Sequence, residues 1–221
     1  MKKSGIAVLT PFHRLLNRQQ KTLLKLLAIF AFSIAAASCG NSGLPELAPD
    51  ATILAFGDSL TSGKGVSKSK AYPAVLATLT SLKVVNAGIS GETTAEGLAR
   101  LPTVLRRTRP DLMVLLEGGN DILHNQDPAI IKANLSNMIN MAEQREIPVV
   151  LIGVPTKSLL GKTAGFYTEL SKEHDVPLET DVIARLLKYP SMKSDALHFN
   201  EAGYSALAQA VADLLKKNGA I

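Results

Sequence analysis

Short apolar runs alternate with segments of helical pattern from Thr52 to the C-terminal end of the chain. The runs are apolar on both faces, which is typical of parallel strands covered by helices on both sides. Five strands are expected, at residues 52–56, 83–86, 111–116, 148–152 and 176–178. The pattern therefore predicts an α/β domain built on a five-stranded parallel sheet.

The segments between these runs carry helix signals. Asp127 followed by Pro128 is typical of an N-cap and a first helical position, and Asn200 is a second N-cap candidate. Helices are expected at residues 71–79, 93–107, 127–146, 163–174, 180–187 and 200–217. Because there is no internal repeat, we assign residues 51–221 to one domain.

The N-terminal part of the chain has the pattern of an export signal. A basic region ends at Lys25, an apolar run fills residues 26–37, and Ser38 and Cys39 follow. The apolar run is shorter than the ~20 residues of a membrane-spanning helix. We therefore expect residues 1–38 to be a signal peptide, which implies an exported, bacterial periplasmic or envelope protein.

Cys39 is the only cysteine of the chain. The sequence Ala36-Ala37-Ser38-Cys39 resembles a bacterial lipobox, in which the cysteine becomes lipidated and N-terminal. We expect Cys39 to carry a membrane anchor, and residues 39–50, rich in small residues and proline, to be a tether. The alternative is ordinary cleavage after the alanines, which leaves a free thiol.

The formal net charge of +5 comes from the leader. Six of the 24 Lys and Arg residues precede residue 39, where there is no acid, so the rest of the chain carries 18 cations against all 19 acids. Nucleic-acid-binding domains usually show a basic patch. The sequence shows none, so no nucleic-acid partner is expected.

The sequence Gly57-Asp58-Ser59 follows the first strand directly. In open α/β sheets ligands bind at the carboxyl ends of the strands, which is where this places the Ser59 hydroxyl. We expect Gly57 to permit a sharp turn. Ser59 is thus a candidate nucleophile; the alternative is a simple Gly/Ser turn.

Three further glycine-containing segments follow predicted strands, at residues 86–93, 117–121 and 153–155. Since parallel strands all end at the same edge, these segments and Ser59 should converge. Asp195, three residues before His198, can hold the imidazole ready to act as a base. The N–H groups of Ser59 and Gly91 and the Asn120 amide would bind an oxyanion.

Four blocks together resemble the GDSL family of hydrolases, also called SGNH. They are Gly57-Asp58-Ser59-Leu60, Gly91, Gly118-Gly119-Asn120-Asp121, and Asp195 with His198. The resemblance implies a three-layer α/β/α flavodoxin-like fold and hydrolysis of acyl esters without metal or cofactor. It also implies Ser59 as nucleophile, His198 as base, Asp195 as its orienting acid, and Ser59, Gly91 and Asn120 as the oxyanion hole. Phe199 departs from the family, which usually has proline there.

Residues 84–91, 97–102 and 173–178 are similar to the bacterial subgroup of thioesterase I, lysophospholipase L1 and arylesterases. This similarity implies a monomer that cleaves small carboxylic esters or thioesters through an acyl-enzyme. Two alternatives stay open: an O-acetylesterase acting on envelope glycans, and a lipid-anchored binding module with an inactive site. The acyl length and the leaving group are not fixed by the sequence.

Some residues near these blocks have structural interpretations. We expect Asp58 and Asp121 to accept backbone N–H bonds, and His124 to lie on a surface loop. Leu159, Leu160 and Phe166 either line an acyl groove or cover the core.

Overall fold

The computed structural model describes residues 43–157 and 161–221. The predicted signal peptide, the predicted lipidation site Cys39, and Leu159 and Leu160 lie outside the described residues. Residues 43–50, expected to belong to the tether, pack on the domain: Leu44 is buried, and its N–H donates to the carbonyl of Asn218 at 2.7 Å. The compact unit runs from Gly43 to Ile221.

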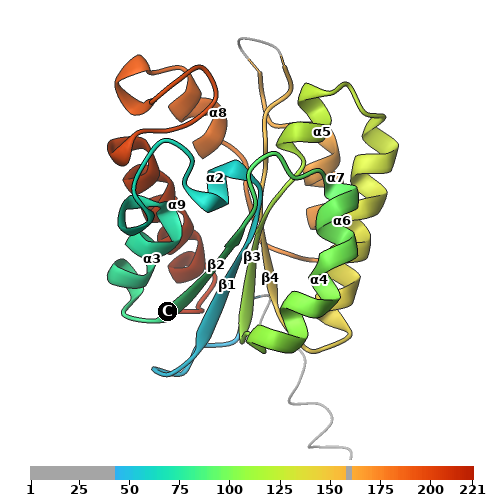
Figure 1. Ribbon diagram of the computed structural model, residues 1–221. Coiled ribbons are helices and arrows are strands. Elements are labelled where there is room, and N and C mark those ends of the chain that lie inside the picture. The colour runs from blue at the N-terminus through green and yellow to red at the C-terminus, as the bar shows by residue number, and fades with distance from the viewer. Residues whose placement is uncertain (1–42, 158–160) are drawn as a thin grey trace, which may run out of the picture. The chain divides into compact units, whose positions relative to one another are not determined.

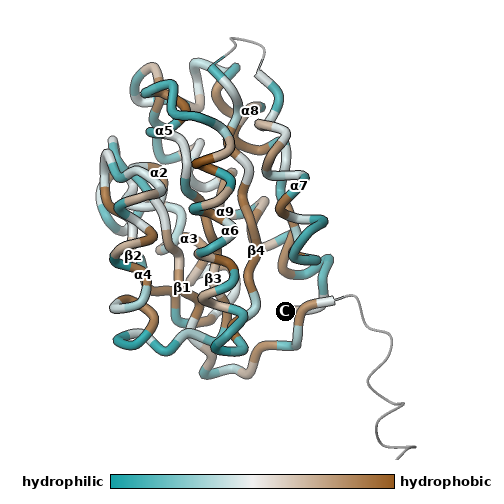
Figure 2. Tube along the Cα trace, turned by 90° about the vertical axis from the view of Figure 1, so that its right-hand side faces the viewer, coloured by the Kyte–Doolittle hydropathy of each residue, from teal (hydrophilic) through white to brown (hydrophobic). Residues whose placement is uncertain are grey.

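The sheet has five parallel strands in the order β2-β1-β3-β4-β5. The strands are β1 (Thr52–Gly57), β2 (Lys83–Gly88), β3 (Leu112–Leu116), β4 (Val149–Ile152) and β5 (Leu178–Glu179). This is the flavodoxin-like order, so the predicted fold is confirmed. Strands β1, β3 and β4 are buried throughout and are hydrophobic in Figure 2, whereas β2 is a partly exposed edge.

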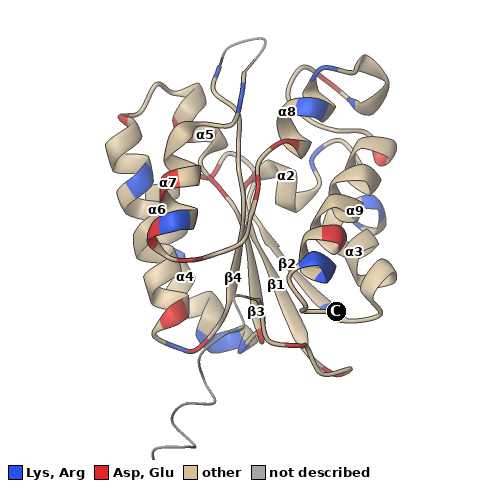
Figure 3. Ribbon diagram, turned by 180° about the vertical axis from the view of Figure 1, so that it is seen from behind, with Lys and Arg blue, Asp and Glu red and all other residues tan. Residues whose placement is uncertain are grey.

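Helices cover both faces of the sheet and complete three layers (Figure 1). One layer holds α3 (Tyr72–Thr80), α8 (Val182–Leu187) and α9 (Glu201–Lys217). The other holds α4 (Thr94–Thr108), α6 (Pro128–Glu143) and α7 (Gly165–Glu173). Charged residues lie mainly on the helices and loops (Figure 3), and the strands β1, β3 and β4 contain none. Among the described helices, none is long and apolar enough to cross a membrane.

The predicted helix caps are present. The carboxylate of Asp127 accepts from the N–H of Ala129 at 2.8 Å, and the side chain of Asn200 accepts from the N–H of Gly203 at 3.1 Å. Both bonds satisfy N–H groups that have no partner within the first turn. Residue Pro102 lies inside α4, and the helix continues through it to Thr108.

Two short helices were not predicted, α2 (Ser59–Ser62) and α5 (Gly119–Leu123). Each follows a central strand directly and is too short to show a helical period. Other boundaries shift by a few residues: α6 ends at Glu143, α7 begins at Gly165, and β5 begins at Leu178. Short 3-10 turns form at Lys68–Lys70 (η2) and Pro190–Met192 (η3).

Candidate active site

Ser59 is the first residue of α2, immediately after β1. Asp58 caps this helix, because its Oδ1 accepts from the N–H of Leu60 at 2.9 Å. Gly57 is needed for a reason other than the predicted turn: a Cβ there would clash with the carbonyl oxygen of Leu116 on neighbouring β3. The close approach of β1 and β3 therefore requires glycine at the end of β1, and Ser59 follows this end at the carboxyl edge of the sheet.

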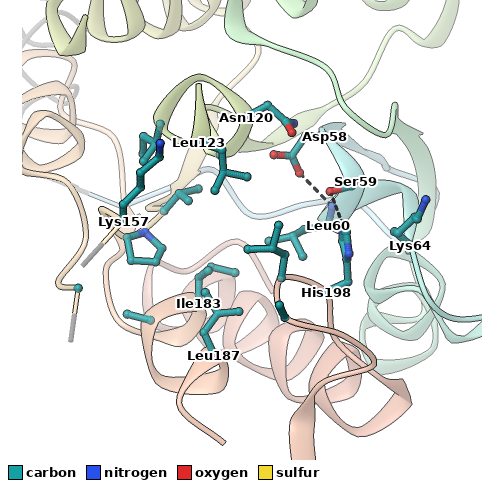
Figure 4. Close-up of a pocket in the computed structure, with 18 of the residues that line it drawn as sticks. Asp58, Ser59, Leu60, Lys64, Asn120, Leu123, Lys157, Ile183, Leu187 and His198 are labelled. Atoms are coloured by element: carbon teal, nitrogen blue, oxygen red, sulfur yellow. Dashed lines mark hydrogen bonds between the residues drawn. The ribbon is translucent and has the colours of Figure 1, made fainter. Parts of the chain in front are cut away.

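His198 reaches Ser59 from the loop before α9. Its Nε2 lies 3.1 Å from the Ser59 Oγ (Figure 4), and its Nδ1 lies 2.8 Å from an oxygen of Asp195. The structure thus brings together three side chains that the sequence separates by up to 139 positions. The order of these contacts is that of a serine nucleophile, a base and an orienting acid.

Asp195 is held in its ionised form. Its carboxylate accepts from the N–H of Leu197, from the His198 ring and from the His198 N–H, and these bonds lower its pKa from 3.8 to about 2. A carboxylate on Nδ1 favours the tautomer in which Nδ1 carries the proton. The His198 Nε2 is then free to accept the serine proton.

Phe199 anchors the histidine loop. Its side chain is fully buried and its ring packs edge-on against the ring of Tyr204, with 5.6 Å between centroids. The Tyr204 hydroxyl in turn donates to the carbonyl of Lys64 at 2.8 Å. Burial of an aromatic ring therefore constrains His198 where a proline was expected.

The predicted oxyanion donors line the same cavity as Ser59. Gly91 has φ +86, a conformation that favours glycine. Among the described residues, the N–H groups of Ser59 and Gly91 donate to no protein acceptor. Asn120 Nδ2 gives one hydrogen to the carbonyl of Glu92 at 2.8 Å, which fixes the amide and leaves its second N–H for a ligand.

A partly buried ion pair that the sequence analysis missed supports this loop. The guanidinium of Arg100 binds the carboxylate of Glu92, donates to the carbonyl of Ala87 at 2.8 Å, and stacks on the ring of Phe56 at 3.9 Å. Because Glu92 also holds the Asn120 amide, Arg100 positions that amide indirectly. A Glu and an Arg eight positions apart look like ordinary surface charges in a sequence.

The predicted structural roles of Asp58 and Asp121 are confirmed. Asp121 accepts from the backbone N–H of Thr94 at 2.9 Å and from its hydroxyl at 2.6 Å, which ties α5 to the start of α4. Both carboxyl groups are buried. The segment that carries Asn120 is therefore held in two ways, by the bonds of Asp121 to Thr94 and by the bond of Asn120 to the carbonyl of Glu92.

Glu117 is a further buried acid beneath the site, in addition to Asp58, Glu92 and Asp121, and it follows the end of β3. Its Oε2 accepts from the N–H of Gly118 at 3.2 Å, and its Oε1 has no partner among the described residues. Burial raises the pKa of Glu117 far above 4.5, and the nearby carboxyl groups of Asp58 and Glu92 raise it further. Burial also raises the pKa of Asp58. Glu117 is thus a neutral acid at neutral pH.

Replacing Glu117 with glutamine should stabilise the protein increasingly as pH rises. Above pH 4.5 the unfolded chain releases a proton that folded Glu117 keeps, so the free energy of unfolding falls by up to about 1.4 kcal/mol per pH unit. Glutamine is neutral in both states and removes this loss. We expect a gain of ~2 kcal/mol or more at about pH 8, measured by urea unfolding from about pH 5 to 9.

The exposed Glu46 provides the control, because Glu46→Gln should leave the pH dependence unchanged. If the difference between Glu117→Gln and the wild type is constant across the pH range, Glu117 does not retain its proton in the folded protein.

The remaining candidates lie away from the catalytic groups. His124 is exposed, as predicted, and Phe166 is buried in the core. Phe166 lines a second cavity rather than the one that holds Ser59. In residues 43–157 and 161–221, no three His, Cys, Asp or Glu side chains gather closely enough to hold a metal ion.

A cavity of about 550 Å³ opens beside Ser59. Figure 4 shows Leu123, Ile183 and Leu187 together on one side of the Ser59–His198 pair. Further apolar lining comes from Leu60, Ile122, Val154, Pro155, Ala184 and Leu197. The cavity can accept an apolar chain whose end is presented to the serine.

Known proteins share this fold and these segments. Residues 55–206 match the family model of the GDSL-like Lipase/Acylhydrolase family. The chain is 31% identical over 177 residues to an arylesterase of Vibrio mimicus, with 75% of this chain and 88% of that protein covered. It is 32% identical over 173 residues to thioesterase 1/protease 1/lysophospholipase L1 of Escherichia coli K12, with 75% and 83% covered.

A solved structure agrees with both relatives. The crystal structure of AlinE4, an SGNH-hydrolase family esterase, superposes with a TM-score of 0.62 at 33% identity and covers 78% of this chain and 98% of that one. The family-model match and the alignments with the two relatives each extend over most of the described domain. The chain therefore belongs to the GDSL-like lipase/acylhydrolase family.

Proposed function

We propose that Ser59 is the nucleophile with which this ester hydrolase forms an acyl-enzyme. The observation that carries the proposal is the row of contacts from Ser59 Oγ to His198 Nε2 at 3.1 Å and from His198 Nδ1 to Asp195 at 2.8 Å. A serine hydroxyl is a weak nucleophile by itself and needs an adjacent base. His198 occupies the position of that base.

In the first step His198 Nε2 accepts the serine proton as Oγ attacks the carbonyl carbon of an ester or thioester. The carbonyl oxygen becomes negative and is bound by the N–H groups of Ser59 and Gly91 and by the free N–H of Asn120. Donors fixed in advance stabilise this charge without reorganisation, and one such donor is typically worth ~3–4 kcal/mol.

The tetrahedral intermediate then collapses. The bond to the leaving oxygen or sulfur breaks, the imidazolium of His198 protonates it, and the acyl group stays on Ser59. Water enters, His198 accepts its proton, and the same donors bind the second oxyanion. Release of the carboxylic acid restores the serine hydroxyl. Asp195 stabilises the imidazolium in both steps.

The cavity supports acyl chains longer than acetyl. Leu123, Ile183 and Leu187 give its far part an apolar surface, which a chain of several carbons would bury. Removal of O-acetyl groups from glycans would leave this surface unused. A series of p-nitrophenyl esters distinguishes these two activities. If the enzyme acts on longer acyl chains, kcat/KM should rise from acetate to octanoate. A maximum at acetate would favour the glycan O-acetylesterase.

Export and a lipid anchor on Cys39 belong to the same proposal, which rests on the leader sequence. A cell expressing the full chain should attach a clickable palmitate analogue to the wild type and not to Cys39→Ser. Equal labelling of the wild type and the variant would contradict a lipid anchor on Cys39. Under this proposal the enzyme works in the bacterial envelope, as a monomer.

Labelling with a fluorophosphonate tests the nucleophile directly. This probe reacts covalently with activated serines, so the purified domain should gain one adduct, located on the peptide that contains Ser59 by mass spectrometry. Turnover of a p-nitrophenyl ester should fall in proportion to the fraction of protein that is labelled. If Ser59 stays unmodified while the protein is folded, the inactive binding module becomes the better interpretation.

A further inference from the structure

Four lysines line the cavity beside Ser59: Lys64, Lys157, Lys188 and Lys193. The lining contains only two other titratable residues, the buried Asp58 and the candidate base His198. The described part of the chain as a whole, these four lysines included, is nearly balanced in charge, with 18 Lys and Arg against 19 Asp and Glu. Figure 3 shows basic segments beside α8, after β4 and near α2, around the end of the sheet where the cavity opens.

The two sides of the catalytic pair differ in character. In Figure 4, Leu123, Ile183 and Leu187 lie on one side of Ser59 and His198, with Lys157 beyond them, and Lys64 lies on the other side. The apolar side accommodates an acyl chain. Because the acyl carbon is bonded to Ser59 during the reaction, the leaving group extends to the opposite side, towards Lys64.

Lys193 lies on a segment next to Lys64. The backbone of Lys193 pairs with Phe199, the residue after His198. Its neighbour Ser194 packs so closely on Gly65 that a Cβ on that glycine would meet the serine hydroxyl. The lysines at positions 64 and 193 therefore extend from adjoining backbone segments at the leaving-group side.

Neither of these lysines forms an ion pair within the described residues. The nearest acid in sequence, Asp195, is engaged with the His198 ring and with backbone N–H groups. Lys157 differs, since its Nζ donates to the side chain of Asn125 at 2.7 Å. The two positive charges at the leaving-group side thus lack an internal partner and can bind an anion of the substrate.

We propose that Lys64 and Lys193 make this hydrolase select substrates whose leaving group carries a phosphate. Two ammonium groups match a phosphate monoester, which has a charge of about −1.5 to −2 near neutral pH, better than a single carboxylate. The inference rests on the proposed acyl-enzyme on Ser59, because that bond fixes which side the leaving group occupies. The phosphate can belong to a nucleotide-containing thiol or to a lipid headgroup.

Two pairs of substrates isolate the phosphate. Octanoyl-CoA and octanoyl-pantetheine share the acyl chain and the thiol arm, but only the first has phosphates. Decanoylglycerol 3-phosphate and decanoylglycerol form the corresponding lipid pair. Since an exposed charge contact changes binding by up to about fivefold, Lys64→Met/Lys193→Met should lower kcat/KM for the phosphate-bearing member about tenfold. The neutral member should change by less than about twofold, and added salt should weaken the preference of the wild type.

The control removes the same amount of charge from the far end of the domain. Lys216 and Lys217 are exposed at the C-terminal end of α9, so Lys216→Met/Lys217→Met should leave every ratio unchanged. A selective loss in either pair supports the inference and identifies the source of the phosphate. An unchanged ratio in both pairs overturns it, while turnover of the neutral substrates still supports the hydrolase. If the wild type cleaves p-nitrophenyl octanoate but no member of either pair, the inference is overturned and the hydrolase stands; if it cleaves none of the five substrates, the proposed function fails as well.

Discussion

The variant Ser59→Ala is expected to lower kcat on p-nitrophenyl octanoate by on the order of 10⁴-fold or more. Alanine removes the only atom that bonds to the acyl carbon, so hydrolysis must proceed by direct attack of water. The oxyanion donors and the cavity remain, which leaves a small residual rate above the uncatalysed one. Turnover at saturating substrate measures the loss, and circular dichroism checks that the variant is folded.

The matched experiment replaces the proposed base, His198. His198→Ala alone, and Ser59→Ala/His198→Ala together, should each lose about as much as Ser59→Ala, because the two side chains act as one unit through their 3.1 Å contact. Losses that multiply in the double variant would mean that the two residues act independently. In that case the acyl-enzyme assignment to Ser59 would have to be withdrawn.

The central strands were predictable because burial on both faces leaves a continuous apolar signal. Strands β1, β3 and β4 follow directly from runs such as 52–56 and 148–152. The edge strand β5 was placed too early, since only Leu178 and Glu179 pair and no periodicity can develop in two residues. Short helices such as α2 escape prediction for the same reason.

The site was predictable as a set of residue types but not as a geometry. Parallel strands end at one edge, which is enough to expect that Ser59, Gly91 and Asn120 meet. His198 follows no strand, and its place in the site was expected from the Asp195–His198 spacing and the family resemblance. The role of Gly57 could not be read correctly, because the clash that excludes a side chain comes from Leu116 on another strand. Contacts across the sheet leave no mark in the local sequence.

The supporting residues were hidden for a different reason. Glu117 and Arg100 are charged residues, and charged residues are usually exposed. Nothing in the sequence distinguishes these two from surface charges, yet Glu117 is fully buried and Arg100 stacks on Phe56. Likewise Lys64 and Lys193 are far apart in the chain, so the sequence shows no basic patch at the cavity.

The variant Asn120→Ala is expected to lower kcat about 10²- to 10³-fold with little change in KM. In the proposed mechanism the free N–H of Asn120 donates to the oxygen that becomes negative in the transition state, whereas the ground-state carbonyl oxygen gains less from this N–H. The loss should therefore fall on the chemical step rather than on substrate binding. Steady-state kinetics on p-nitrophenyl octanoate distinguish an effect on kcat from an effect on KM, and a thermal melt verifies that the variant is folded.

A second asparagine provides the control for the loss of an amide. Asn134 donates to the hydroxyl of Thr94 at 3.0 Å, beneath the same loop, but does not line the cavity. Asn134→Ala should destabilise the fold slightly and keep kcat within about twofold. The loop itself should survive Asn120→Ala, because Arg100 holds Glu92 independently through its carboxylate. Full activity of Asn120→Ala would therefore exclude the amide from the oxyanion hole, and the backbone N–H groups of Ser59 and Gly91 would then have to carry the charge alone.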